Sequence, residues 1–322
     1  MSDDALPLRR VLITGAHGLV GRHVAALLDA EGVELVCPHR PGSVPPEGAP
    51  GRQVERDLER EPIDDLLEDV DAVVHLAAQA GGIQLQEHSQ AELYYANQAI
   101  TRSVLASLAR AAVRRVFLAS SAVVYRDLDL DLIPETAPVV SPASDRVTAY
   151  AWSKLTDELA ASWYAAAGVL DPVIGRFTNV YGPGAPLDPE RSTVVHSLVR
   201  KALEAGPDRR VEVWGDGTAV RSFLYVEDVA RAVVVLLRRG RSGGVYNVDS
   251  SEPVTIAQLA EVVRDAVDPE LVLEFDPSKP QGPRRRVLDS SALRALGFTP
   301  QVSLVDGVRA TVRAAAAALG RA

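Results

Sequence analysis

The chain has little of what marks an exported, membrane or nucleic-acid-binding protein. It holds one cysteine, Cys37, which excludes an intrachain disulfide framework and gives no sign of an oxidising compartment. No apolar run is long enough to span a bilayer, and the first residues, Met1 to Asp4, are acidic rather than apolar. The formal net charge of -9 argues against broad nucleic-acid binding. We therefore expect a cytoplasmic protein that contacts neither nucleic acid nor membrane.

Metal-binding patterns are also scarce. Asp127, Asp129 and Asp131 alternate with leucines, and their spacing resembles a calcium loop. The glycine and the terminal glutamate of such a loop are missing, so we interpret this stretch as a solvated loop. His75 stands in an apolar strand, where packing outweighs catalysis as a role. For His196, on a predicted helix, surface or packing roles outweigh catalysis. We therefore expect no metal site.

A glycine-rich turn follows the first apolar stretch. Residues 11–14 predict a buried strand, and apolar residues recur at helical spacing from Val20 onward. Strand, glycine turn and helix together predict the opening of a dinucleotide-binding fold, because glycines let the backbone approach a pyrophosphate at the helix N-terminus. The predicted cofactor contacts here are Gly15, His17, Gly18, Leu19 and Val20.

The second predicted strand bears on which dinucleotide is bound. An NAD site usually places an acid at the end of this strand to hold the ribose 2′-hydroxyl, whereas an arginine accommodates a 2′-phosphate. Residues 34–38 end without an acid, and Arg40 follows, although it could also be a solvated loop cation. This favours NADP, as NADPH, and leaves NAD possible. Asp57, after a third predicted strand, is a candidate for the adenine.

Apolar strands continue to alternate with helices. Strands are predicted at 72–78, 116–125 and 172–177, with a helix from about residue 89 to 112 between the first two. The alternation predicts an α/β fold with a doubly wound parallel Rossmann sheet, whose ligands lie at the carboxyl ends of the strands. Ser121 ends one such strand. We expect residues 1–175 to form the NAD(P)-binding domain, with 211–240 returning to it, and 176–322 a smaller C-terminal α/β substrate-binding domain.

Tyr150 and Lys154 are four residues apart on a predicted helix and so project from one face. The ammonium would then favour the ionised phenol, and the phenol could donate or remove a proton at a carbinol or ketone carbon. Tyr-x-x-x-Lys alone is a weak signal, because exposed pairs of this kind often arise by chance. Its meaning depends on the rest of the chain.

The glycine turn, Ser121 and the pair Tyr150/Lys154 together resemble the extended short-chain dehydrogenase/reductase family (NAD-dependent epimerase/dehydratase), which acts mainly on nucleotide sugars. The resemblance covers essentially the whole chain and includes segments 74–78, 179–183 and 221–228. It implies that Ser121, Tyr150 and Lys154 are catalytic and that the protein is a homodimer. Further cofactor contacts implied are Leu58, Leu76, Ala77, Ala78, Phe177, Asn179 and Val180, with Tyr150 and Lys154. Substrate contacts implied are Ser121, Ala122, Val123, Asn179, Trp214, Arg221 and Lys279.

Within the family, segments 33–40, 77–83, 213–217 and 278–284 resemble GDP-fucose synthases, and 119–122 and 175–179 resemble GDP-mannose 3,5-epimerases. Both groups carry a cysteine that serves as an acid/base at C3 and C5, where this chain has Val123. The partner base falls at Thr193. A valine cannot move a proton, so the resemblance implies hydride transfer without 3,5-epimerisation. His17 replaces an arginine of the synthases, which weakens the preference for NADP.

The resemblance implies NADPH-dependent reduction of the C4 keto group of a nucleotide-linked 4-keto-6-deoxyhexose. A 4-epimerase that retains NAD is the alternative, and a non-catalytic NADP-binding protein is less expected because tyrosine and lysine are both present. A dehydratase would add an acidic pair where Ala122 and Val123 stand. The partner is a nucleotide-diphosphate sugar. The arginines at 284–286 are either a solvated face or, beside a phosphate pocket, ligands of its diphosphate.

Overall fold

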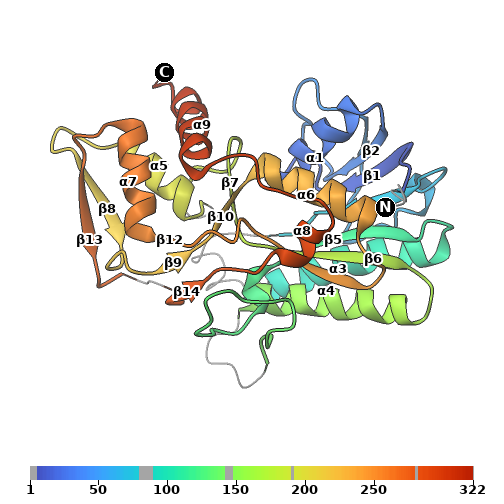
Figure 1. Ribbon diagram of the computed structural model, residues 1–322. Coiled ribbons are helices and arrows are strands. Elements are labelled where there is room, and N and C mark those ends of the chain that lie inside the picture. Colours follow the sequence, from blue (N-terminus) through green and yellow to red (C-terminus); the bar gives the residue numbers. More distant parts are fainter. Residues whose placement is uncertain (1–5, 80–89, 142–147, 190–191, 280–281, 322) are drawn as a thin grey trace.

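Seven parallel strands form the central sheet (Figure 1), in the order β11-β6-β5-β4-β1-β2-β3. The computed structural model describes residues 6–79, 90–141, 148–189, 192–279 and 282–321. The strands of this sheet are β1 (Arg10–Thr14), β2 (Glu34–His39), β3 (Arg52–Glu55), β4 (Ala72–His75), β5 (Arg115–Ser121), β6 (Asp171–Phe177) and β11 (Gly244–Val248). The chain winds outward from β1 in both directions, which confirms the doubly wound sheet expected from the sequence.

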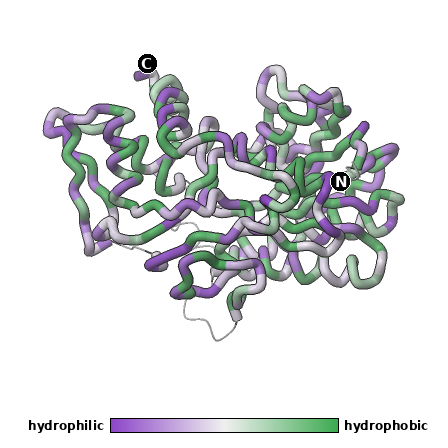
Figure 2. The backbone as a smooth tube through the Cα atoms, viewed as in Figure 1, coloured by the Kyte–Doolittle hydropathy of each residue, from purple (hydrophilic) through white to green (hydrophobic). Residues whose placement is uncertain are grey.

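Helices cover both faces of this sheet. Helix α1 (Leu19–Ala30) packs against α6 (Val226–Arg239) on one face, and α3 (Gln90–Arg110) packs against α4 (Ala149–Ala166) on the other. Successive residues of a strand therefore enter different cores: Val11 of β1 packs with α1 and α6, and Leu12 packs with α3. Burial on both faces explains why the strands read as unbroken apolar runs. Figure 2 shows the hydrophobic stretches running along them.

A second, smaller lobe lies beside the sheet, on the left of Figure 1. Its core is formed by α5 (Val194–Leu203), α7 (Ile256–Val267) and α9 (Leu304–Ala318), packed over a two-stranded parallel sheet. The strands of this lobe and of its junction with the main sheet are β7 (Asn179–Tyr181), β8 (Arg210–Trp214), β9 (Val220–Arg221), β10 (Phe223–Tyr225), β12 (Val254–Thr255), β13 (Val272–Asp276) and β14 (Arg285–Arg286). Three one-turn or short helices complete the described elements, namely η1 (Asp64–Leu66), η2 (Ala122–Val124) and α8 (Ser291–Ala295).

Two strands lie in sheets other than those their sequence ranges suggested. Strand β8 falls within 211–240, which was expected to return to the first domain, but it pairs with β13 in the second lobe. Its burial alternates, with Val211 and Val213 facing the helices, as suits an outer sheet. Strand β11 was expected in the second domain, but it adds to the edge of the main sheet beside β6. Of the returning segment, α6 does pack on the main sheet. The domain boundaries themselves stay a prediction.

Within the described ranges, no helix is long and apolar enough to cross a membrane. The same part of the chain holds no cluster of three or more His, Cys, Asp or Glu side chains suited to a metal ion.

Candidate functional site

The glycine turn between β1 and α1 is shaped by close backbone contacts. Gly15 has φ +72, and a Cβ there would lie 2.8 Å from the backbone nitrogen of Ala77. A Cβ on Gly21 would collide with the Gly15 carbonyl oxygen. Gly18 is the N-cap of α1 and has no side chain that could cap the first N–H groups of the helix. The turn thus fits a pyrophosphate at the helix N-terminus.

Two imidazoles lie beside this turn at the end of β2. The rings of His17 and His39 are 5.5 Å apart, and His17 Nε2 is 2.8 Å from Oε1 of Gln53. Arg40 follows on the exposed loop. The carboxylate of Asp57 accepts a hydrogen bond from the Glu59 N–H (3.1 Å) and pairs with Arg60, so it is engaged within its own turn. The roles of Arg40 and Asp57 stay predictions.

Ser121 and the helix bearing Tyr150 lie at the carboxyl edge of the sheet. Ser121 ends β5, pairs in register with Phe177 of β6, and accepts a long hydrogen bond from the Val123 N–H (3.4 Å). Helix α4 begins at Ala149 with Thr148 as its cap, and its Ala151 and Leu155 pack against Ala122 and Val124 of η2. The first turn of α4 is therefore held against the turn that follows Ser121.

Lys154 lies on the same face of α4 as Tyr150. Its Nζ is 6.0 Å from the centroid of the Tyr150 ring, as the four-residue spacing predicts. The lysine is 4% exposed and faces the carboxylate of Asp157 at 3.7 Å. The ammonium thus lies on the side of α4 that carries the phenol, and it is shielded from water.

His75, interpreted as a packed residue, and His196, expected at the surface or in packing, are both buried and hydrogen-bonded. Nδ1 of His75 is 2.7 Å from the Thr14 hydroxyl, and Nε2 is 3.2 Å from the Thr101 hydroxyl. Burial, with the charge of Lys154, lowers the pKa of His75 to about 3. His196 lies between the Thr193 hydroxyl (2.9 Å) and the Gly182 carbonyl oxygen (3.1 Å). Thr193, the position aligned with a base in related enzymes, is thus a partner of a buried histidine.

Two buried polar residues near the site were not predicted as site residues. Asn97 of α3 donates to the carbonyl oxygen of Gln79 (3.0 Å) and accepts from its N–H (2.7 Å), which ties the segment after β4 to α3. Asp157 pairs with Lys154. Their only sequence signal is a polar residue on an otherwise buried helix face. Residues 80–83 and 280–281, which carry part of the family resemblance, lie outside the described residues.

Several of the predicted substrate contacts lie on the second lobe and its junction. Lys279 Nζ is 5.9 Å from the centroid of the exposed Trp214 ring. Arg221 of β9 and Arg286 of β14 are register neighbours, and Arg286 pairs with Asp127 at 2.8 Å. Burial, together with the charge of Arg286, lowers the pKa of Arg221 to about 10. Neighbouring guanidinium groups drawn out of water favour an anion between them.

Asn179 and the residues after β4 are held by hydrogen bonds to neighbouring strands. Asn179 on β7 donates to the Ser222 carbonyl oxygen (2.9 Å), which fixes its side chain beside β10. The Ala77 N–H donates to the Thr14 hydroxyl (3.2 Å), so residues 76–78 pass directly behind the glycine turn. The nicotinamide end of a dinucleotide would reach this region, and the roles of these residues stay predictions.

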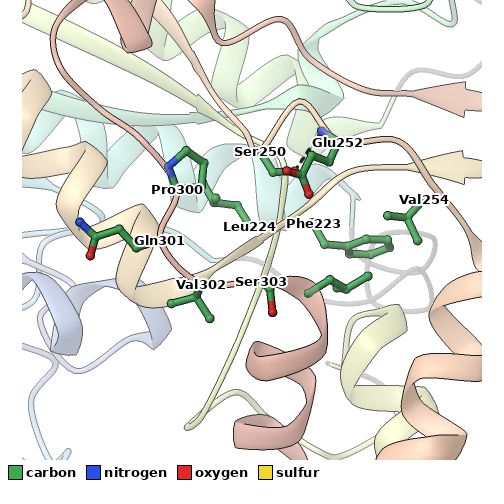
Figure 3. Close-up of a pocket in the computed structure, with 10 residues that line it drawn as sticks. Phe223, Leu224, Ser250, Glu252, Val254, Pro300, Gln301, Val302 and Ser303 are labelled. Atoms are coloured by element: carbon green, nitrogen blue, oxygen red, sulfur yellow. Dashed lines mark hydrogen bonds between the residues drawn. The ribbon is translucent and has the colours of Figure 1, made fainter.

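A cavity of about 270 Å³ lies away from these residues, between β10, the segment after β11 and the start of α9 (Figure 3). Ser250 and Glu252 stand at one side of it, where the Glu252 N–H donates to the Ser250 hydroxyl (3.3 Å). None of the predicted catalytic, cofactor or substrate residues lines it. It is therefore separate from the candidate active site.

The fold and its glycine turn define a doubly wound α/β protein of the Rossmann type. Residues 11–249 match the model of the NAD dependent epimerase/dehydratase family, and the chain belongs to that family. A putative GDP-L-fucose synthase 2 of Oryza sativa subsp. japonica is 35% identical over 240 residues, covering 74% of this chain and 69% of that protein. The dTDP-4-dehydro-6-deoxy-D-allose reductase of Streptomyces bikiniensis is 32% identical, covering 97% of this chain and 98% of its own. The crystal structure of UDP-glucose 4-epimerase from Thermus thermophilus in complex with NAD superposes with a TM-score of 0.82 at 27% identity, covering 95% of this chain and 98% of that one.

Proposed function

We propose that the protein uses NADPH to reduce the C4 keto group of a nucleotide-linked 4-keto-6-deoxyhexose. The observation that carries the proposal is the placement of Ser121, Tyr150 and Lys154 at the sheet edge that also holds the glycine turn. The similarity to a dTDP-4-dehydro-6-deoxy-D-allose reductase over 97% of the chain supports a keto-sugar substrate.

Tyr150, Ser121 and Lys154 have separate roles at the carbonyl group. When bound at the glycine turn, NADPH would supply the hydride for sugar C4. Tyr150 donates its phenol proton to the C4 oxygen as negative charge develops there. Ser121 donates a hydrogen bond to the same oxygen, which orients the carbonyl and stabilises the charge. Lys154 would stabilise the negative charge left on Tyr150 and would hold the ribose hydroxyls of the bound dinucleotide. One hydride and one proton convert the ketone into an alcohol.

The diphosphate of the substrate fits the neighbouring arginines at the junction. Arg221 and Arg286 lie side by side on adjacent strands, and Arg286 also pairs with Asp127. Burial disfavours the charge of Arg221, and a diphosphate beside it would stabilise that charge. Lys279 over Trp214 offers a cation and a ring face for the nucleotide.

NADPH is the proposed cofactor because β2 ends without an acidic residue of its own and is followed by Arg40. The nearest carboxylate at this point is that of Glu55 on β3, which is the register neighbour of His39 and accepts from the Gly42 N–H (3.3 Å). Arg40 is exposed on the loop after β2, and the imidazole of the preceding residue, His39, is 5.5 Å from that of His17. A 2′-phosphate held here would be accommodated by Arg40. The proposal gives NADPH the lower dissociation constant, with NADH bound more weakly.

Val123 restricts the proposed chemistry to C4. Its isopropyl group occupies the position of an acid/base thiol in enzymes that invert C3 and C5. The alternative, a 4-epimerase that retains NAD, is favoured by the similarity to a UDP-glucose 4-epimerase solved with NAD. The two differ in one readily measured property: the reductase consumes NADPH in proportion to product, whereas the epimerase leaves its dinucleotide unchanged.

We also propose that the protein is a homodimer formed through α3 and α4. A groove of about 530 Å³ runs between these helices and is lined mainly by apolar side chains. Tyr95 and Trp163 of the same two helices are 71% and 65% exposed. An apolar face of this kind suits an isologous contact between two copies.

The test of the reductase assignment is turnover by purified protein. We expect oxidation of NADPH with a 4-keto-6-deoxy nucleotide sugar, and loss of at least about a thousand-fold in kcat, on the order of 4 kcal/mol, in Tyr150→Phe. The variant should keep its NADPH affinity, because only the hydroxyl is removed. In deuterated water, NMR of the product should show no deuterium at C3 or C5. Unchanged turnover in the variant would refute the role of Tyr150.

A further inference from the structure

Asp157 is a buried carboxyl group beside the candidate catalytic lysine, and the reduction described above does not use it. It lies three residues after Lys154 on α4 and is 2% exposed. Gln98 of α3 donates to its Oδ1 at 3.0 Å. Its Oδ2 accepts no hydrogen bond from the described residues and faces Lys154 Nζ at 3.7 Å. One oxygen is thus anchored to α3, and the other faces the ammonium.

The Lys154 ammonium depends on this carboxylate for its counter-charge. Among the described residues, Asp157 is the one carboxylate within ion-pair distance of Lys154. A buried charge without a partner is costly, and removing one member of such a pair leaves the other uncompensated. The other titratable and charged groups around Asp157 cannot replace it: His75 on β4 stays neutral, and Arg102 and Tyr164, which line the same groove, are not carboxylates.

We propose that Asp157 is a positioning residue, whose carboxylate supplies the counter-charge of the Lys154 ammonium and fixes it on the face of α4 that carries Tyr150. Lys154 in turn acts on the phenol and on the cofactor ribose, so this inference rests on the proposed function. The anchor from Gln98 makes the position of the carboxylate depend on the packing of α3 against α4. A change in the packing of α3 against α4 would therefore change the position of Lys154 through its ion pair with Asp157.

The pair has a pH dependence of its own. Burial raises the pKa of Asp157 to about 6, although the nearby charge of Lys154 opposes the rise. As the pH falls through about 6, the carboxyl takes up a proton and Lys154 loses its counter-charge. The proposal therefore predicts that kcat falls as the pH drops below about 6. This acid limb is opposite to what proton uptake by the reduction alone would give, since that step is favoured at low pH.

The chain suits a direct test because it contains three lysines, Lys154, Lys201 and Lys279. Protein labelled with 13C at the lysine ε-carbons gives one resonance for each, assigned with Lys154→Arg. From pH 5 to 8, the Lys154 resonance should move with a midpoint near 6. Lys201 serves as an internal reference, because its hydrogen bond holds the pKa of its partner Glu212 below the usual range. A Lys154 resonance that does not respond would overturn the proposal.

Two variants separate positioning from general destabilisation. Asp157→Asn removes the charge and keeps the shape; kcat should fall about ten- to a hundred-fold, with KM for the sugar little changed and the limb near pH 6 lost. Asp157→Glu should recover part of kcat and restore the limb. Asp228→Asn is the matched control, since Asp228 is equally buried and pairs with Arg231, also three residues away, outside the candidate site.

The outcomes distinguish this inference from the proposed function. If the protein reduces no keto sugar, the proposed function fails, and the lysine resonances of the wild-type protein still decide whether Asp157 and Lys154 titrate together. If the protein is a reductase and Asp157→Asn keeps the wild-type kcat and pH profile, the positioning role fails alone. A loss of activity of equal size in Asp228→Asn, with both pH profiles unchanged, would also refute it.

Discussion

The buried imidazole of His75 makes the folded state sensitive to acid. The pKa of His75 is lowered from 6.5 to about 3, chiefly by burial. Between these values the unfolded chain binds a proton that the folded chain does not, so this group lowers stability as the pH falls below 6.5. Asp157 acts in the opposite sense, because its raised pKa makes the folded chain bind the additional proton below about pH 6.

The contribution of His75 is isolated by comparing the wild-type protein with His75→Gln. On going from pH 7 to pH 5, the wild-type free energy of unfolding should fall by roughly 2 kcal/mol more than that of the variant. Chemical denaturation at each pH measures both. Equal slopes for His75→Gln and the wild-type protein would show that the imidazole is protonated in the folded state.

At the scale of single residues, the sequence predicts those functional residues that can be identified from their spacing along a helix or strand. Tyr150 and Lys154 are recognisable because a helix places every fourth residue on one face, and Ser121 because it ends an apolar strand. Asp157 is not recognisable, because its burial depends on how α3 packs on α4. Arg286 likewise acquires a neighbour in Arg221 only when β14 pairs with β9.

Among the elements, the turn from β1 into α1 leaves little room for added atoms. Gly21→Ala would place a methyl group against the Gly15 carbonyl oxygen and 2.8 Å from the Ala16 Cα. We expect the free energy of unfolding to fall by about 1–3 kcal/mol, and NADPH affinity to fall with it because the turn must move. Denaturant unfolding and fluorescence titration measure the two effects.

Gly206→Ala is the control for this substitution, because the nearest atom to a Cβ there is the Asp208 carboxylate oxygen at 3.5 Å. It should leave both quantities unchanged. Wild-type NADPH affinity in Gly21→Ala would mean that the turn does not carry the pyrophosphate. Loss of stability with full affinity would separate the packing role of this glycine from cofactor binding.

Elements are predicted well where both faces of a strand are covered and less well elsewhere. The apolar runs of β1, β4, β5 and β6 imply burial between two helical layers, and they form adjacent strands of the main sheet. Strands β8 and β11 are each of five residues and follow helices, so local pattern does not show which sheet they join. That choice depends on β13 and β6, which are far away in the sequence.

At the scale of the whole molecule, the groove between α3 and α4 leaves an apolar surface uncovered. Trp163, Leu159 and Tyr95 of these helices are all exposed. In an isologous dimer both subunits contribute the same side chains to the interface, so one substitution changes the interface at two places. The groove also includes Asp157, so a second copy would reinforce the burial of the ion pair with Lys154.

Trp163→Asp tests the dimer, because it places a carboxylate where the proposed contact is apolar. The dimer dissociation constant should rise about thirty-fold or more, equivalent to roughly 2 kcal/mol, measured by light scattering or sedimentation over a range of concentrations. Val44→Asp, on a 90% exposed valine of the loop after β2, should leave it unchanged. A wild-type protein that is monomeric at every concentration would refute the dimer. Monomeric Trp163→Asp protein with a lower kcat and a smaller pH-dependent shift of the Lys154 resonance would show that burial of the groove supports the Asp157–Lys154 pair. Monomeric protein with full activity would confine the dimer to a structural role.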